Sequence, residues 1–311
     1  MRLSRGDFAS ALAVIVIWGL NFVVMKFGLQ GLSPMLMGAL RFAVASLPFL
    51  PFVKRPHLPR RLIVVYGLAQ GLGQFGLLFL AIHMGMTAGV ASVVMQMQAF
   101  FTLLLAVPLL GERARPDQWA GLAVAATGLL LIALAHGDGP QQMTLIGFVL
   151  TVGAAFMWAS SNIVIRVAGR AGRTYDPFAF IVWTSAVPVL PFLALATLAD
   201  GPASVLASLA AIGWRESAAV AYLGLLATLL AYTLWTRLLK RHPTHRVAPF
   251  SLLVPVVGLW AAAVVLGERP SPLQWWGTAA VWLGLLINQF GSRLVTWLKR
   301  LANGSERAAT G

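Results

Sequence analysis

The sequence predicts an all-α, polytopic membrane protein of ten transmembrane helices in two inverted five-helix repeats. Hydrophobic residues make up 59% of the chain and charged residues 10%, with a mean hydropathy of +0.82. Residues 62–111, 50 in a row, contain no Asp, Glu, Lys or Arg. About 20 apolar residues cross the hydrocarbon core of a bilayer as a helix, so this run must cross it twice. Similar motifs also recur in the two halves of the chain.

Charged and turn-forming residues divide the chain into ten apolar segments. The segments cover residues 8–29, 34–53, 62–82, 88–110, 117–135, 144–168, 177–199, 216–238, 247–266 and 272–292. Glycine or proline, which interrupt helices, recur in the gaps at 31–34, 54–56, 85–89, 111–116, 137–140, 200–202, 242–243 and 269–272. The first segment is too long for a signal-peptide core and no clear cleavage site follows it, so we interpret it as the first helix.

The distribution of Lys and Arg predicts the orientation, because loops on the cytoplasmic side are enriched in these residues. With both termini inside, only Lys26, Arg215 and Arg269 fall on the outer side. Arg41 falls within a helix, and the remaining 19 of the 23 Lys and Arg residues lie inside. The net charge of +14 therefore has a topological role beside anionic lipid headgroups, and nucleic-acid binding is not expected.

Three pairs of motifs occur in the same order in both halves. WGLNFVVMK at 18–26 matches WASSNIVIR at 158–166, and LPFLPF at 47–52 matches LPFLAL at 190–195. Gly-Glu-Arg followed by Gln-Trp occurs at 111–119 and again at 267–275. We therefore predict one repeat over residues 8–136, a second over 144–292, and a basic, disordered cytoplasmic tail over 293–311.

Five helices per repeat is an odd number, so the second repeat would enter the bilayer from the opposite side. Inverted repeats of this kind place a solute site at the repeat interface, and exchange of shape between the halves opens that site to each side in turn. This symmetry predicts a carrier, with a passive channel as the alternative from another class.

Four segments resemble the EamA-type family of the drug/metabolite transporter superfamily. They are WGLNFVVMKFGL at 18–29, GALRF at 38–42, GVASVVMQMQAFFT at 89–102 and RVAPFSLLVPVVGL at 246–259. Within that family they are similar to exporters of O-acetylserine and cysteine. The resemblance implies a secondary transporter that exports amino acids or amino-acid metabolites across the bacterial inner membrane. The alternative within the superfamily is export of drugs, purines or other small metabolites.

Arg41 is the charged residue expected at membrane depth, ~10 Å from the outer end of the second helix. Such groups are costly unless they face a cavity or a partner. One interpretation is that its guanidinium binds a substrate carboxylate. The alternatives are a structural cation bonded to backbone carbonyls, or a side chain that extends to the headgroups.

Other polar and aromatic residues are candidates for a substrate cavity. Trp18, Asn21 and Met25 share one face of the first helix, and Trp158, Ser161 and Asn162 occupy the matching position in the sixth. The substrate-binding candidates, Arg41 included, are Trp18, Asn21, Arg41, Gln74, Gln98, Trp158, Asn162 and Tyr232. Gln96 lies about 160° around its helix from Gln98 and is not expected to face the same cavity. The alternative for all of them is packing between helices.

Charged residues near the helix ends have simpler interpretations. We expect Lys26 and Arg166 to extend to the headgroups as anchors. Each of the two Gly-Glu-Arg motifs predicts an ion pair between neighbours, or a helix cap, at Glu112 and at Glu268. Small residues spaced along the tenth helix predict either close helix packing or a homodimer face: Gly277, Val281, Gly284 and Asn288.

Several functions are disfavoured by what the sequence lacks. There is no Cys and no phosphate-binding loop, and no acidic residue is expected in the middle of a predicted span. We therefore predict no catalytic residue, no metal site and no cofactor. Proton- and sodium-coupled pumps often use an intramembrane carboxylate, so its absence favours facilitated export or exchange. The expected partners are the bilayer and a small amino-acid-like substrate, with the chain a monomer or homodimer.

Overall fold

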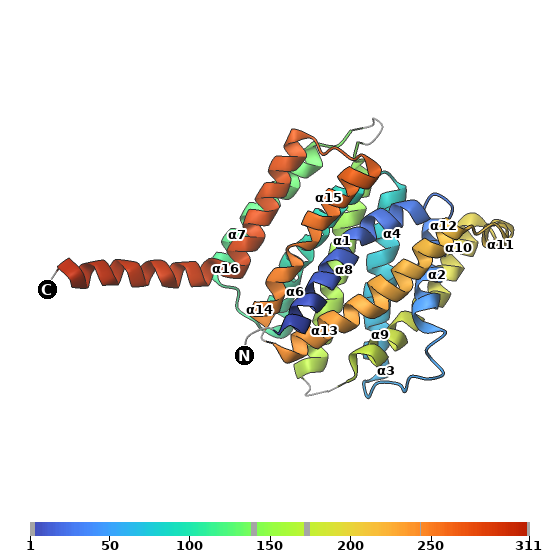
Figure 1. Ribbon diagram of the computed structural model, residues 1–311, viewed down its shortest axis with the longest axis horizontal. Helices are drawn as coiled ribbons and strands as arrows, with labels where there is room; N and C mark the ends of the chain where they lie inside the picture. The colour runs from blue at the N-terminus through green and yellow to red at the C-terminus, as the bar shows by residue number, and fades with distance from the viewer. Residues whose placement is uncertain (1–3, 138–141, 171–174, 243, 310–311) are drawn as a thin grey trace.

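The computed structural model describes residues 4–137, 142–170, 175–242 and 244–309, and within these ranges every regular element is helical (Figure 1). The first half contains α1 (Arg5–Gly28), α2 (Pro34–Ser46), α3 (Arg60–Tyr66), η1 (Gly67–Phe75), α4 (Gly76–His83), α5 (Ala88–Val94), η2 (Met95–Met97), α6 (Gln98–Leu110) and α7 (Pro116–Leu134). The second contains α8 (Leu145–Arg170), α9 (Pro177–Ala186), α10 (Val189–Asp200), α11 (Pro202–Ala210), α12 (Trp214–Ala221), η3 (Tyr222–Leu230), α13 (Ala231–Arg241), α14 (Thr244–Ser251), α15 (Val254–Leu266) and α16 (Pro272–Ala309).

Many of these helices are long and apolar enough to cross a bilayer, which confirms a multi-pass membrane protein. Among the described residues eight qualify: 5–28, 60–83, 88–110, 116–134, 145–170, 177–200, 214–241 and 249–266. α2, the second predicted span, is shorter, and α16, which contains the tenth, is not among the eight. The count of ten spans and their orientation therefore remain predictions.

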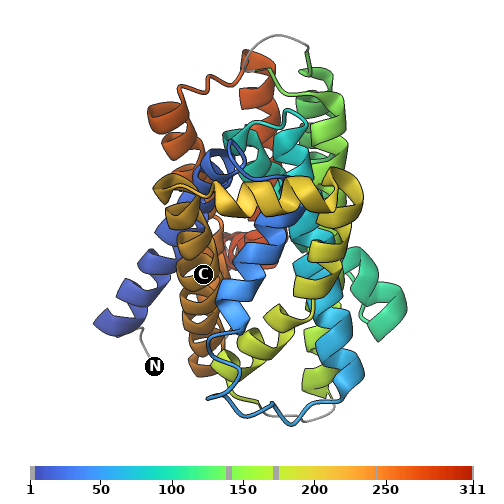
Figure 2. The same ribbon diagram turned by 90° about the vertical axis from the view of Figure 1, so that its right-hand side faces the viewer.

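Three predicted segments take a different course in the structure. The helix predicted over 34–53 ends at Ser46, because Pro48 and Pro51 have no backbone N–H to donate. The segment between Asp200 and Trp214, predicted as a loop, holds the short helix α11, which lies across its neighbours in Figure 2. α16 continues to Ala309, where the sequence predicted a disordered tail, since no proline after Pro272 ends it. Residues 310–311 of that tail lie outside the described residues.

Two segments of wider, π-helical pitch lie at comparable places in the third predicted span of each half, 62–82 and 216–238. η1 and η3 are each nine-residue π-helical segments. π-helical turns are uncommon and occur frequently at functional sites. In η3 the Thr228 hydroxyl donates a hydrogen bond of 2.7 Å to the carbonyl oxygen of Leu223, five residues earlier. η1 contributes Gln74 and Phe75 to the cavity described below, and η3 ends two residues before Tyr232, which also lines it.

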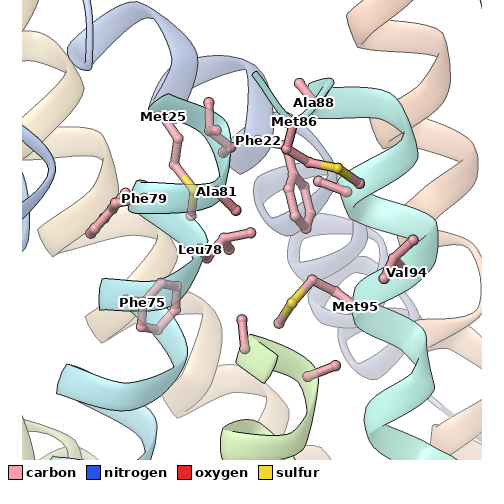
Figure 3. Packing of buried hydrophobic residues seen from close by; sticks show 14 of the residues in the cluster. Phe22, Met25, Phe75, Leu78, Phe79, Ala81, Met86, Ala88, Val94 and Met95 are labelled. Atoms are coloured by element: carbon pink, nitrogen blue, oxygen red, sulfur yellow. The ribbon is translucent and has the colours of Figure 1, made fainter. Parts of the chain in front are cut away.

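The core lies where α1, α4 and α5 meet, as Figure 3 shows. Phe22, Leu78 and Met95 approach one another there, and Met25 and Met86 fill the space beyond them. Met25 and Met86 are 0% and 1% exposed. Interlocking side chains of this kind leave no room for a solute to pass.

α7 and α16 pack against each other along a seam of glycines. A methyl group at Gly128 would lie 2.6 Å from the carbonyl oxygen of Gly277, and one at Gly284 would lie 2.5 Å from that of Gly121. Only glycine allows two helix backbones to approach this closely. The small residues of the tenth helix therefore serve close packing within one chain. The homodimer-face alternative is wrong for this stripe, because α7 of the same chain already covers it.

Candidate functional site: a central cavity

A cavity of about 1020 Å³ lies among the helices of both halves. Its walls include all eight side chains that the sequence singles out: Trp18, Asn21, Arg41, Gln74, Gln98, Trp158, Asn162 and Tyr232. Phe22, Leu78 and Met95 bound it on the side of the core. The volume suffices for a small metabolite, since sites for small molecules typically enclose ~300–1,000 Å³.

Arg41 is 1% exposed, which excludes a side chain that extends to the lipid headgroups. Its Nε donates a hydrogen bond of 3.0 Å to the Thr228 hydroxyl, across 187 positions of sequence. The guanidinium carbon lies 3.7 Å from the centre of the Phe75 ring. Its buried Nη1 makes no hydrogen bond, and its Nε bonds a side chain and not a backbone carbonyl. Arg41 therefore lines the cavity while one buried nitrogen of its guanidinium keeps an unused donor.

Three aromatic rings form one wall of the cavity. The Trp18 ring centre lies 4.9 Å from that of Tyr232 and 5.6 Å from that of Trp235. The Trp18 indole donates a hydrogen bond of 3.1 Å to the Ala227 carbonyl oxygen in η3. This bond fixes the ring and joins α1 to the π-helical segment of the other half. The wall is rigid and apolar, with the Tyr232 hydroxyl as its polar edge.

Amide side chains line the cavity from α1, η1, α6 and α8. Asn162 Nδ2 donates to Gln98 Oε1 at 2.7 Å and to the Thr102 hydroxyl at 3.3 Å, which joins α8 to α6. Asn21 Oδ1 and Gln74 Oε1 are buried and accept no hydrogen bond. Buried polar groups without partners are uncommon in folded proteins, and each calls for an explanation. Together with Arg41 Nη1, one unused donor and two unused acceptors therefore belong to residues that line the cavity.

Gln96 also lines the cavity, together with Gln98, so the prediction that only one of them faces it is wrong. The reason is local: Met95–Met97 form a 3₁₀ turn, and helical geometry was assumed for the whole segment. Gln96 Nε2 donates a hydrogen bond of 3.3 Å to the Ser251 carbonyl oxygen. Tyr66 also belongs to the wall, and its sequence context of apolar residues gave no signal.

Two ion pairs mark the two ends of the bundle and correct the predicted lipid anchors and the predicted pairs between neighbours. The helix-cap alternative is confirmed at Glu268, which accepts hydrogen bonds from the backbone N–H groups of Ala88 and Gly89. Lys26 Nζ lies 2.8 Å from Glu268 Oε1, and Arg166 Nη1 lies 2.8 Å from Glu112 Oε2. Neither glutamate pairs with its neighbour in the Gly-Glu-Arg motif, and neither cation is simply a lipid anchor. The turn that follows each helix directs the glutamate toward another helix, because Gly111 and Gly267 adopt a left-handed conformation with φ of 65° and 67°.

The cavity reaches only one end of the bundle. Glu112, Arg113 and Arg166 belong to its lining, whereas Lys26 and Glu268 do not. The end that holds Glu112, called here the Glu112 end, is therefore open, and the opposite Lys26 end is closed. Figure 3 shows part of the apolar packing that separates the two.

The lining favours reversible binding over covalent chemistry. Among the described residues, no three His, Asp or Glu side chains are grouped to hold a metal ion. Glu112 at the open end is the sole carboxylate among the lining residues. What the cavity offers a solute is a guanidinium, amides and aromatic faces.

Comparison with known proteins agrees with this arrangement. A model of the EamA-like transporter family matches residues 6–134 and again residues 145–289. The chain is 42% identical over 303 residues to a "probable amino-acid metabolite efflux pump" of Escherichia coli (strain K12), covering 97% of this chain and 100% of that one. A protein of Salmonella typhimurium (strain LT2) with the same name is 44% identical over 292 residues, covering 94% and 97%.

A more distant relative and a solved structure extend the comparison. A "probable terminal-alkyne amino-acid exporter" of Streptantibioticus cattleyicolor is 28% identical and covers 92% of this chain and 94% of its own. One crystal structure aligns with a TM-score of 0.62 and 19% sequence identity, covering 93% of this chain and 98% of that chain. At this identity the structural match shows the shared fold.

Proposed function

This chain belongs to the EamA-like transporter family, and we propose that it exports amino acids or amino-acid metabolites across the bacterial inner membrane. Membership of the family makes it a membrane transporter and not an enzyme. The proposed substrate class follows the names of two relatives that are 42% and 44% identical over nearly the whole chain. It also follows the chemistry of the cavity.

The unused donor of Arg41 is the observation that carries this proposal. A guanidinium buried without a counter-ion is costly in a protein interior, and a substrate carboxylate would supply the missing charge. An amino acid also carries an ammonium group, which needs acceptors. Asn21 and Gln74 also line the cavity, and each has a buried acceptor, Oδ1 and Oε1 respectively, that lacks a hydrogen-bond partner.

We further propose that the two halves are inverted repeats and that transport occurs by alternating access. Supporting this, the family model matches each half separately. π-helical segments and left-handed glycines recur at corresponding positions. The cavity is open at the Glu112 end, which the Lys and Arg distribution assigns to the cytoplasm together with both termini. An exporter must begin its cycle in such an inward-open state.

The structure favours facilitated export or exchange over transport coupled to protons or sodium ions. Glu112 is the sole carboxylate of the lining and lies at the open end, paired with Arg166. No carboxylate faces the centre of the cavity among the described residues to take up a proton there. Export of cationic drugs, the alternative from the same superfamily, is disfavoured by Arg41, which would repel a cation.

Counterflow in proteoliposomes tests the substrate assignment. We expect the full-length protein to exchange labelled cysteine against internal cysteine but not against cysteamine, which lacks the carboxylate. Replacing Arg41 with Gln should lower counterflow by about tenfold or more, because the carboxylate loses its charged donor. Arg215→Gln, an exposed cation on α12, is the matched control and should retain wild-type rates. Unchanged exchange by a folded Arg41→Gln variant would remove Arg41 from the site.

A further inference from the structure

The two ion pairs connect the halves of the chain in a crossed pattern. Lys26 and Arg166 end matching motifs in the first helix of each half, and Glu112 and Glu268 belong to matching Gly-Glu-Arg motifs. Lys26 of the first half pairs with Glu268 of the second, and Arg166 of the second half pairs with Glu112 of the first. The two pairs are therefore related in the same way as the two halves.

The pairs differ in their surroundings. Glu268 is 4% exposed, whereas the side chains of Glu112 and Arg166 are 36% and 45% exposed. Glu268 also accepts hydrogen bonds of 2.9 Å from the backbone N–H groups of both Ala88 and Gly89, at the start of α5. Glu112 instead has Arg170 as a second partner, with 3.1 Å between Nη2 and Oε1. One pair is built into a closed interface and the other lines an open mouth.

Glu268 thus joins three elements at the closed end. It follows α15, pairs with the last turn of α1 and caps the first turn of α5. A methyl group at Gly89 would lie 3.1 Å from Leu259 and 3.3 Å from Ala262, so α5 and α15 touch directly beneath it. A carboxylate that satisfies two backbone donors and one ammonium group holds these helices together.

We propose that the glutamates of the two Gly-Glu-Arg motifs act as alternating closures of the transport cavity. In the state seen here Glu268 closes the Lys26 end by capping α5 while bonded to Lys26. In the opposite state Glu112 closes its own end in the same way, bonded to Arg166. The sequence supplies the equivalent helix start: Thr-x-x-Val-Ala occurs at 87–91, where α5 begins, and again at 244–248, where α14 begins.

This proposal rests on the alternating access proposed above, but not on the identity of the substrate. If one equilibrium links the two ends, weakening the Glu268 closure favours the outward-open state. Weakening the Glu112 closure must shift the same equilibrium in the other direction. A glutamate that only stabilised the fold would lower stability without this reciprocal effect.

Cysteine accessibility tests the proposal, because the natural chain contains no Cys. Ala262→Cys reports on the closed end, where Ala262 is 1% exposed, and Leu239→Cys reports on the cavity wall. Membrane-impermeant maleimide is applied from either side of vesicles that contain the full-length protein. Glu268→Gln should raise outside labelling at 262 by about tenfold and lower inside labelling at 239. Glu112→Gln should change both rates in the opposite directions.

Additional variants separate closure from folding. Lys26→Gln leaves the Glu268 cap on α5 in place and should shift the rates much less than Glu268→Gln, because the matching Arg166–Glu112 pair is present at the open end. Glu216→Gln is the matched control, because Glu216 caps α12 through the backbone N–H of Gly213 and should shift neither rate. Labelling changes in the same direction for Glu268→Gln and Glu112→Gln, or no changes, would overturn the proposal. Because labelling needs no substrate, failure here is distinct from failure of the counterflow experiment.

Discussion

The position of Arg41 was predictable, but its environment was not. A lone charge in an apolar segment stands out in any sequence. The residues that hold it come from elsewhere in the chain: Thr228 is 187 positions away, and Phe75 belongs to another helix. Helical periodicity places a residue on a face and does not show which distant residue that face meets. The eight candidates were therefore found as separate points, and the structure supplied the cavity that joins them.

The bond between Arg41 and Thr228 yields a prediction at the same scale. Thr228→Val keeps the shape of the side chain and removes the oxygen that accepts from Nε. The guanidinium then loses its one side-chain hydrogen bond and is less well oriented toward a carboxylate. We expect KM for exported substrate to rise about tenfold with little change in kcat, measured by initial rates in proteoliposomes.

Thr233→Val provides the control for this variant. The Thr233 hydroxyl is buried, has no hydrogen-bond partner and does not line the cavity. Its replacement should leave KM unchanged. Equal KM values for Thr228→Val and the wild type would show that the hydroxyl does not orient Arg41.

Among the elements, the structure departs from the sequence where a helix changes its pitch or direction. The apolar pattern predicted continuous helices, yet η1 and η3 are π-helical and Met95–Met97 is a 3₁₀ turn. Composition alone cannot reveal these changes, because π-helical and α-helical turns use the same residues. The consequence for the site was concrete, since the 3₁₀ turn brings Gln96 to the cavity beside Gln98. Proline could have indicated the end of α2, which Pro48 follows, but it does not end every helix, since Pro108 lies within α6.

The glycine seam between α7 and α16 gives the element-scale prediction. In Gly128→Val the new side chain would meet the backbone of Gly277 and Val281, which cannot move away cheaply. We expect the variant to lose ~1–3 kcal/mol of stability or more, measured as a lower thermal midpoint in detergent. Ala126→Val, on the exposed face of α7, is the control and should retain the wild-type midpoint. A wild-type midpoint for Gly128→Val would contradict the close packing.

For the whole molecule, the end that the charge distribution predicts to be cytoplasmic is also the end at which the cavity is open. The Lys and Arg distribution assigns the loop after α6 to the cytoplasm, and the cavity is open at that same end, beside Glu112. Charge patterning was available from the sequence because translocation depends on short loops beside the helices. Which end of the cavity is open could not be predicted from the sequence, because it depends on which of two similar ion pairs is buried.

The proposed orientation can be measured directly with single cysteines. Ser4, His57, His136 and Asp200 are all exposed. Ser4 precedes the first predicted span, and the other three lie in different connections between predicted spans. With both termini inside, Ser4→Cys and His57→Cys should react with an impermeant maleimide only after cells are permeabilised. His136→Cys and Asp200→Cys should react in intact cells. An odd number of spans in each half requires this alternation, because otherwise the second half could not run opposite to the first. Reaction of Ser4→Cys and His136→Cys from the same side would therefore remove the basis for inverted repeats, and with it the reason to expect Glu112 and Glu268 to exchange roles.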